Sequence, residues 1–336
     1  MNSNPAFSGS LLGLEYVAAA THGLRGVAVQ TPLLESHEAN ERLGARLLIK
    51  AENMQRTGAF KIRGAYNCIR QLTNAQKAGG VITYSSGNHA QGVALAARLF
   101  GTHALIVMPD DVPEAKRAAT RALGARIVMF SRDAEASDDV VERLRRQTGR
   151  IVVPPSGDLR VLAGAATVAT ELLEQASGKN ARLDALLVPC GGGGLTAASA
   201  VVMAARSPDT RVYAVEPAQF DDTRRSLATG QRVANPPGRR TICDAIMTPM
   251  PNELTFAINR ELLAGGLTAS DAEVRDAMRF VYRHFRMVVE PGAAVGLAAV
   301  LAGQIDIAGK TVATIITGGN IDAARFCRLV GPDTHE

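Results

Sequence analysis

The chain has 336 residues, of which 46% are hydrophobic and 21% charged, as expected for a globular protein with one large domain or two smaller ones. Its net charge of +5 could indicate an anionic partner, but aromatic residues make up only 4%, which disfavours nucleic-acid binding by base stacking. The sequence shows no apolar run long enough to span a membrane and no signal peptide, and its four cysteines are dispersed, so we expect a cytoplasmic protein with reduced thiols.

Short apolar segments alternate with helical segments along the chain. After a helix and a turn in the N-terminal region, strands are expected at 45–50, 81–84, 104–107, 126–130, 151–153, 185–188, 211–215 and 311–317. Helices are expected at 90–99, from 113, and at 133–147, 163–175, 196–205, 271–284 and 293–302, while 221–266 is irregular. Because these strands lack polar alternation and are followed by helices, the pattern predicts an α/β fold with parallel, twisted sheets and helices on both faces.

The first distinctive segment, TGAFKIRGA at 57–65, places Lys61 between Phe60 and Ile62. Burial would lower the pKa of this lysine, because desolvation disfavours the charged form. A neutral amine is what a Schiff-base lysine requires. The alternative is a surface lysine whose aliphatic stem covers its apolar neighbours.

A run of four glycines at 191–194 follows the strand expected at 185–188 and precedes a helix. Such a run loses much backbone entropy on folding, which indicates close approach to a ligand. Backbone N–H groups at a helix N-terminus bind anions, most often phosphate. The alternative is tight packing of the helix on the sheet. The preceding Cys190 is expected to be a small buried residue and not a reactive thiol.

The segment SSGNHAQG at 85–92 also joins a strand to a helix. Hydroxyl and N–H groups of such a turn could bind a substrate carboxylate, and Asn88 adds an amide donor. His89 could act as an acid or base, although a lone histidine is more often only hydrogen-bonded. After the last strand, Thr317 and the glycines before Asn320 place a neutral hydroxyl at the same sheet edge.

Together and in this order, the four segments resemble the fold-type II family of pyridoxal-phosphate enzymes, which includes threonine and serine dehydratases, serine racemases and 3-hydroxyaspartate dehydratases. The resemblance implies that Lys61 binds the cofactor covalently, that Asn88 hydrogen-bonds its phenolic oxygen and that Thr317 faces its pyridine nitrogen. It also implies residues that hold the phosphate, residues that bind substrate and residues near the cofactor. The phosphate residues are Gly191, Gly192, Gly193, Gly194 and Leu195; the substrate residues are Ser85, Ser86, Gly87, Asn88 and His89; the neighbours are Phe60, Glu290 and Gly318.

The same resemblance implies a two-domain fold like that of the tryptophan synthase β chain. Residues 1–53 plus 153–336 would form the large pyridoxal-phosphate-binding domain and residues 54–152 the small domain, with the active site in the cleft between them. The resemblance also implies a homodimer and an amino-acid substrate, while the composition and the lack of a long apolar run predict no nucleic-acid or membrane partner.

The expected reaction is the elimination of water and ammonia from a β-hydroxy amino acid to give a 2-oxo acid, with Lys61 as general base. Serine, threonine, 3-hydroxyaspartate and bulkier 3-hydroxy amino acids are all possible substrates. The alternative is an amino-acid racemase, in which Ser86 would exchange a proton on the opposite face of the substrate. A scaffold that only binds a phosphorylated ligand is a third hypothesis.

An acidic segment, VEPAQFDD at 215–222, resembles the divalent-cation loop of serine racemases and 3-hydroxyaspartate dehydratases. The resemblance implies Glu216, the carbonyl group of Phe220 and Asp222 as ligands. This all-oxygen set suits Mg²⁺ or Ca²⁺. The alternative is a solvated acidic turn.

Overall fold

The computed structural model describes residues 11–131 and 134–331. Its strands are β1 Leu33–Glu35, β2 Arg46–Ala51, β3 Val81–Tyr84, β4 Ala104–Pro109, β5 Arg126–Phe130, β6 Ile151–Val152, β7 Ala185–Pro189, β8 Arg211–Pro217, β9 Gly265–Ala269 and β10 Thr311–Ile316. Its α-helices are α1 Leu14–Gly23, α2 His37–Leu43, α3 Lys61–Arg70, α4 Asn74–Gly79, α5 Asn88–Leu99, α6 Glu114–Ala122, α7 Ser137–Thr148, α8 Leu159–Gly178, α9 Gly194–Arg206, α10 Asp222–Thr229, α11 Glu253–Leu262, α12 Asp271–Phe285, α13 Pro291–Leu301 and α14 Ala323–Val330. Three short 3-10 turns are η1 Glu52–Met54, η2 Arg56–Gly58 and η3 Asp244–Ile246.

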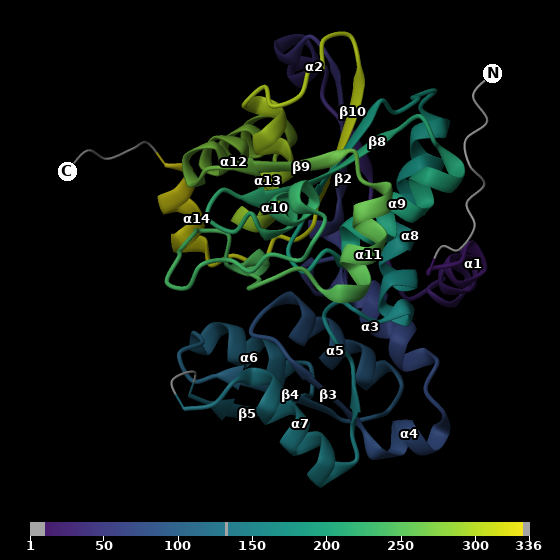
Figure 1. Ribbon diagram of the computed structural model, residues 1–336, viewed down its shortest axis with the longest axis vertical. Coiled ribbons are helices and arrows are strands. Elements are labelled where there is room, and N and C mark those ends of the chain that lie inside the picture. Colours follow the sequence, from purple (N-terminus) through teal and green to yellow (C-terminus); the bar gives the residue numbers. More distant parts are fainter. Residues whose placement is uncertain (1–10, 132–133, 332–336) are drawn as a thin grey trace.

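The strands form two sheets, one above the other in Figure 1. The larger sheet has the order β1-β2-β10-β7-β8-β9, and the smaller has the order β5-β4-β3-β6. All neighbouring strands are parallel except β1, which pairs antiparallel with β2. The predicted α/β fold with parallel sheets is therefore confirmed.

Helices cover both faces of each sheet. On one face of the larger sheet, α12, α13 and α14 bury side chains such as Met278, Val295 and Phe326. On the other face, α1, α8 and α9 do the same with Val17, Leu172 and others. In the smaller sheet, α3 and α5 pack on one face and α7 on the other. Figure 1 shows α3 and α5 between the two sheets, and α3 also packs against α8.

Several elements differ from the sequence prediction. The edge strands β1 and β9 were not expected, and the interval 221–266 contains α10 and α11. Helix α5 begins two residues earlier than expected, at Asn88. The helix predicted over 133–147 begins at Ser137; Asp133 lies outside the described residues, as do residues 1–10 of the N-terminal region. Among the described residues, no helix combines the length and apolar character needed to cross a membrane.

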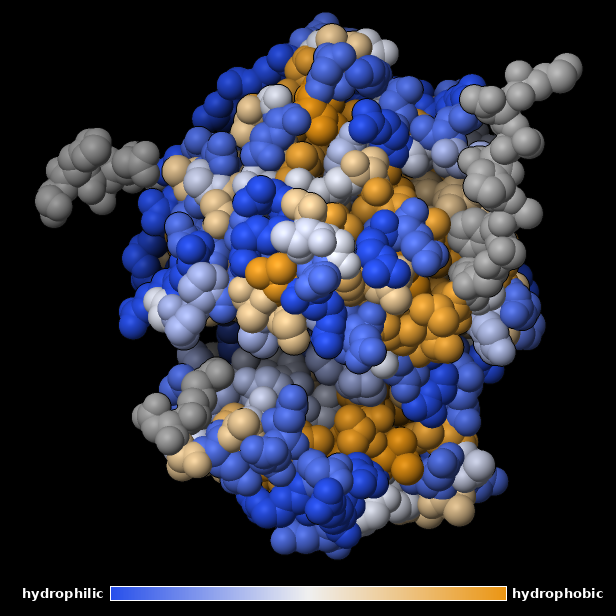
Figure 2. Space-filling view, viewed as in Figure 1, coloured by the Kyte–Doolittle hydropathy of each residue, from blue (hydrophilic) through white to orange (hydrophobic). Residues whose placement is uncertain are grey.

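The strands of the smaller sheet all come from residues 81–152, and those of the larger sheet come from residues 33–51 and 185–316. Figure 2 shows a recess between the two parts on the face viewed. We propose that each sheet with its helices is a domain and that the boundaries lie near residues 53 and 153, as the sequence predicts.

Candidate active site

Lys61 is the first residue of α3, at the point where this helix meets α5 and α8. Two glycines allow this close approach. A methyl group at Gly92 of α5 would lie 3.0 Å from the backbone carbon of Lys61, and one at Gly164 of α8 would clash with the carbonyl oxygen of Arg63. The backbone N–H of Phe60 donates to the Thr317 carbonyl at 3.1 Å, which fixes the start of α3 beside the end of β10.

The environment of the Lys61 amine disfavours its charge. Desolvation is the main cause, and it lowers the pKa of Lys61 to about 8, although the negative charge of Glu290 opposes the shift. The positive end of α3 acts in the same direction as desolvation. The Nζ atom donates a hydrogen bond to the Pro155 carbonyl oxygen at 3.0 Å and lies 5.1 Å from the centre of the Phe60 ring. Lys61 is thus a partly buried amine that loses its proton more readily than a surface lysine.

The glycine run connects β7 to α9 and lies next to Lys61. Gly193 has a φ of 79°, a left-handed conformation that disfavours other residues. The Thr255 hydroxyl of α11 donates to the Gly192 carbonyl at 2.7 Å, which turns that carbonyl toward α11. The first N–H groups of α9 have no partner within the helix, so an anion could bind them. Gly194 and Leu195 line the same small cavity as Phe60 and Lys61.

Close packing also contributes to the need for these glycines. A methyl group at Gly192 would lie 2.7 Å from the Ser156 hydroxyl oxygen, and one at Gly191 would lie 3.3 Å from the backbone of Ile246. Cys190 is buried, and burial raises the pKa of its thiol to about 12. This thiol is therefore a packing residue, as expected.

Residues 85–87 form the turn between β3 and α5. The Gly87 N–H donates to the Ser85 hydroxyl at 3.2 Å, and both Ser85 and Ser86 are partly exposed. The His89 ring is buried and lies 2.9 Å from the Val153 carbonyl oxygen through Nε2. Because a carbonyl only accepts, Nε2 carries the proton. Burial and the nearby Lys61 lower the pKa of His89 to about 3, so the ring is neutral at pH 7.

Asn88 and Glu290 meet beside the end of β10. The Asn88 Nδ2 donates to the Glu290 Oε1 at 2.6 Å. Burial raises the pKa of Glu290 to about 7, and the Asn88 hydrogen bond opposes that shift. Gly318 leaves the space that Glu290 and Asn88 occupy, since a methyl group there would collide with the Glu290 carboxyl group. Thr317 is buried next to them. The structure thus brings Lys61, Asn88, Glu290, Thr317 and the glycine run to one sheet edge.

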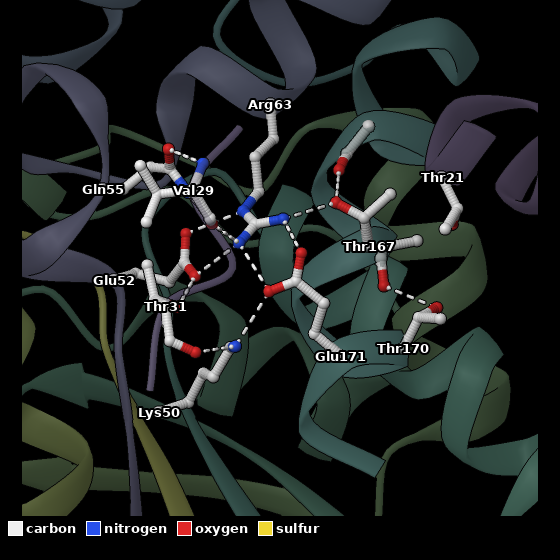
Figure 3. Close-up of polar contacts among 12 residues, drawn as sticks. Thr21, Val29, Thr31, Lys50, Glu52, Gln55, Arg63, Thr167, Thr170 and Glu171 are labelled. Carbon is white, nitrogen blue, oxygen red and sulfur yellow. Dashed lines mark hydrogen bonds and ion pairs between the residues drawn. The ribbon is translucent and has the colours of Figure 1, made fainter. Parts of the chain in front are cut away.

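A buried ionic cluster joins α3 to neighbouring elements (Figure 3). Arg63 is fully buried; its Nε atom lies 2.8 Å from Glu52 Oε2 and its Nη1 atom 2.7 Å from Glu171 Oε1. Lys50 is also fully buried and pairs with Glu171 at 2.9 Å. Desolvation opposes ionisation of Glu171, but Arg63 and Lys50 outweigh it and hold its pKa below the usual value. These pairs join η1, α3, α8 and β2 at one point.

The acidic segment at the end of β8 packs against α10. The Glu216 carboxylate accepts hydrogen bonds from the backbone N–H groups of Thr223 and Arg224 at 2.9 and 2.8 Å. Burial and repulsion by Asp222 raise the pKa of Glu216 to about 8, and burial raises that of Asp222 to about 6. The Asp222 Oδ2 atom is buried without a hydrogen-bond partner. Phe220 is buried beside them. No cluster of three His, Cys, Asp or Glu side chains suited to a metal occurs within the described residues.

Comparisons with known proteins identify the family of this chain. Residues 24–318 match the family described as "Pyridoxal-phosphate dependent enzyme". The chain belongs to this family. It is 41% identical over 315 residues to an L-threo-3-hydroxyaspartate ammonia-lyase of Saccharomyces cerevisiae, covering 94% of this chain and 95% of that protein. It is 38% identical to a serine racemase of Schizosaccharomyces pombe, covering 94% and 96%. A crystal structure of a threonine deaminase from T.th. superposes with a TM-score of 0.86 at 40% identity, covering 92% and 99%.

The residues at the site fit the cofactor that defines this pyridoxal-phosphate family. A partly buried amine that deprotonates readily suits covalent attachment of an aldehyde. The glycine run presents helix N-terminal N–H groups where only glycine fits, which suits a phosphate. The resemblance expected from the sequence is thereby confirmed as to family and cofactor.

Two polar residues at the site were assigned no role from the sequence. The Ser156 hydroxyl lies against Gly192, and Asn320 hydrogen-bonds Asn88. Ser156 belongs to the segment VPPSG, whose prolines and glycine indicate a turn after a strand. Such a turn at a sheet edge is the signal that could have identified it.

Proposed function

We propose that this protein is a pyridoxal-phosphate-dependent ammonia-lyase that converts a β-hydroxy amino acid to a 2-oxo acid and ammonia. The observation that carries the proposal is the partly buried Lys61 amine beside a glycine run, in a chain about 40% identical to named ammonia-lyases along nearly its whole length. The relatives named L-threo-3-hydroxyaspartate ammonia-lyase favour a 3-hydroxy amino acid with a second carboxylate.

Each residue has a proposed task. Residues 191–195 hold the cofactor phosphate, Asn88 and Thr317 contact its ring, and Lys61 binds it and then removes the α-proton of the substrate. The cofactor, when bound, withdraws electrons from the α-carbon. The Thr317 hydroxyl is a neutral partner, unlike a carboxylate, and this favours prompt loss of a β-leaving group. Ser85, Ser86 and Gly87 bind the substrate carboxylate, and Phe60, Glu290 and Gly318 enclose the cofactor.

The protonation state of His89 favours a positioning task. Its ring is neutral at pH 7 and its Nε2 proton is committed to Val153. We propose that His89 shapes the substrate turn by anchoring the start of α5 to residue 153, and that it takes no part in proton transfer.

A panel of 3-hydroxy amino acids tests the proposal. Each stereoisomer of serine, threonine and 3-hydroxyaspartate is incubated with the holoenzyme, and 2-oxo acid and ammonia are measured together. We expect equal amounts of both products from at least one stereoisomer, with the highest kcat/KM for 3-hydroxyaspartate. Visible absorbance from bound cofactor without either product would support a racemase, and a colourless protein would support a ligand-binding scaffold.

Ser86 is the residue that distinguishes a lyase from a racemase, the second candidate function, which the serine racemase relatives favour. If the enzyme also racemises its substrate, Ser86→Ala is expected to abolish enantiomer exchange, because no other base is proposed for that face. Elimination from the L-isomer should stay within about tenfold of wild type, since Lys61 is retained. Chiral chromatography of substrate recovered from D₂O measures both. The opposite enantiomer appearing at the wild-type rate in the variant would contradict the assignment.

We also propose that Glu216, the Phe220 carbonyl and Asp222 hold Mg²⁺ or Ca²⁺. Two neighbouring buried carboxyl groups with raised pKa values, one with an unpaired oxygen, are a natural site for a hard cation. Against this, both Glu216 oxygens already accept backbone hydrogen bonds.

The pH dependence of stability tests this cation site. The pKa of Glu216 is raised to about 8 in the folded state without a divalent cation. Between the unperturbed carboxyl pKa and this value, the folded state therefore binds more protons than the unfolded state. The free energy of unfolding should consequently fall as pH rises through this window. Mg²⁺ or Ca²⁺ should reverse the loss, by ~2.7 kcal/mol at a hundredfold excess over its Kd. Asp222→Asn should weaken both effects. Melting curves from pH 5 to about 8.5, with chelator or cation, measure them.

The control for this experiment is Asp209→Asn, which removes an exposed carboxylate that pairs with Arg182. It should leave the cation response unchanged. Melting temperatures of the wild-type protein that ignore both chelator and cation at pH 8 would identify the segment as a structural turn.

Finally, we propose that the enzyme acts as a cytoplasmic homodimer on a small amino-acid substrate. Dispersed cysteines, three of them buried and free, support a reducing compartment. Exposed apolar residues, including Val29, Met54 and Val288, support a second subunit.

A further inference from the structure

Three side chains form a continuous hydrogen-bonded row at the edge of the larger sheet. Asn320 Nδ2 donates to Asn88 Oδ1 at 2.8 Å, and Asn88 Nδ2 donates to Glu290 Oε1 at 2.6 Å. The same Asn320 Nδ2 donates its other hydrogen to the Thr57 carbonyl oxygen at 2.7 Å. The row therefore begins at a backbone carbonyl and ends at a carboxyl group.

The chemistry of these groups determines which way each amide points. A backbone carbonyl can only accept, so the Asn320 atom that contacts Thr57 must be nitrogen. That nitrogen also contacts Asn88, and the Asn88 atom facing it must therefore be oxygen. The Asn88 nitrogen then faces Glu290, whatever the protonation state of Glu290. One N–H of Asn88 bonds Glu290, and the second remains available to another acceptor.

The backbone around Thr57 keeps Asn320 in this position. Thr57 has a φ of 62°, which is unusual for a β-branched residue and indicates strain that the surrounding structure maintains. The Gly319 N–H donates to the Gly58 carbonyl at 2.9 Å, which ties the turn after β10 to η2. Gly58 has a φ of 69°, and a methyl group on it would collide with the Asn320 side chain.

We infer that Asn320 is a positioning residue for the cofactor: it fixes the orientation of the Asn88 amide so that its second N–H faces the phenolic oxygen of pyridoxal phosphate. The inference rests on the proposed function through the cofactor contact assigned to Asn88. Asn320 itself acts through Asn88 and Thr57. Without it, the Glu290 contact alone orients the Asn88 amide. An amide that turned over would present its carbonyl oxygen to the cofactor oxygen, which would repel it.

Two variants test this inference: Asn320→Asp should reverse the orientation of the Asn88 amide, whereas Asn320→Ala only removes its partner. Aspartate keeps the size but has only acceptors, so Asn88 must turn its nitrogen toward residue 320. Alanine removes the partner and leaves Asn88 held by Glu290. We expect the Kd for pyridoxal phosphate, measured by fluorescence quenching of the apoprotein, to rise about tenfold in Asn320→Asp and about threefold in Asn320→Ala.

The pH titration of the visible band of bound pyridoxal phosphate is the readout that a merely structural residue would not move. A hydrogen bond to the ionised phenolic oxygen favours that form, so its loss should raise the titration midpoint by about one pH unit in Asn320→Asp. Asn53→Asp is the matched control, because Asn53 borders the same turn at Gly319 but bonds Val288. It should leave both the Kd and the midpoint unchanged.

The outcomes separate the inference from the proposed function. If Asn88→Ala shifts the Kd and the midpoint but Asn320→Asp shifts neither, the positioning role of Asn320 is wrong. It is also wrong if Asn320→Asp raises the Kd less than Asn320→Ala does. If Asn88→Ala also leaves both at wild-type values, the assigned contact between Asn88 and the cofactor is wrong. Should Asn320→Asp fail to fold, the Kd of Asn320→Ala decides, and a wild-type value there would overturn the inference.

Discussion

Replacing Lys61 with alanine is expected to lower the rate of ammonia release by at least about 1,000-fold and to remove the visible absorbance of bound cofactor. The variant loses the amine that attaches the cofactor and the base that takes the α-proton. The fold should remain, because within the described residues the Lys61 side chain contributes a single hydrogen bond, to the Pro155 carbonyl. Ammonia release and absorbance spectra measure the two effects, and a melting curve checks the fold.

Lys61→Arg sharpens this test. Arginine keeps a positive charge at the site but does not lose its proton in proteins, so it cannot supply the neutral amine that the lowered pKa of Lys61 makes accessible. We expect it to be as inactive as Lys61→Ala. Lys310→Ala, which removes a lysine paired with Asp306, should be fully active. Ammonia release by Lys61→Ala within tenfold of wild type would exclude Lys61 as the catalytic base.

Replacing Arg63 with alanine is expected to cost about 3–5 kcal/mol of unfolding free energy. The variant leaves Glu52 fully buried and Glu171 largely buried without the guanidinium that pairs with both. Only Lys50 would remain to compensate Glu171. Denaturant unfolding at pH 7 measures the loss, and Arg182→Ala, whose ion pair with Asp209 is 79% and 74% exposed, should cost less than about 1 kcal/mol.

The loss should depend on pH. Arg63 and Lys50 hold the pKa of Glu171 below its usual value, so this carboxylate stabilises the wild-type protein above its unfolded pKa and loses that contribution as pH falls. In Arg63→Ala the buried Glu171 carboxyl group loses its main cationic partner, so its protonation becomes less costly. The difference in unfolding free energy between the two proteins should therefore shrink below about pH 5. A difference that is constant with pH would mean that lost packing, and not charge, causes the destabilisation.

The features that the sequence predicts well are local. Lys61 and the glycine run lie at junctions between a strand or turn and a helix, and their conformational demands are visible in a few consecutive residues. Arg63 is different, since its partner Glu171 lies 108 positions away, and nothing near residue 63 indicates that the charge is buried. Strand β9 was missed because Gly265 and Gly266 interrupt the apolar pattern, and only pairing with β8 makes this segment a strand.

Asn320 shows the same division between local and distant information. The glycines before it predict a turn, but its bonds reach Thr57 and Asn88, which are 263 and 232 positions away. Its role depends on which atoms of two amides face each other, and this follows from the acceptor character of one carbonyl group. Only the folded arrangement reveals it.

The place of β10 in the larger sheet governs when this sheet can form during synthesis. β10 lies between β2 and β7, and its residues 311–316 pair with residues 46–51. A ribosome adds about 5–20 residues per second, so β2 waits on the order of tens of seconds for this neighbour. Until β10 is made, the edges of β2 and β7 that pair with it stay exposed on the nascent chain. We therefore expect a chaperone to protect the chain during its synthesis. By contrast, the smaller sheet is complete once residue 152 has emerged, and we expect it to fold first.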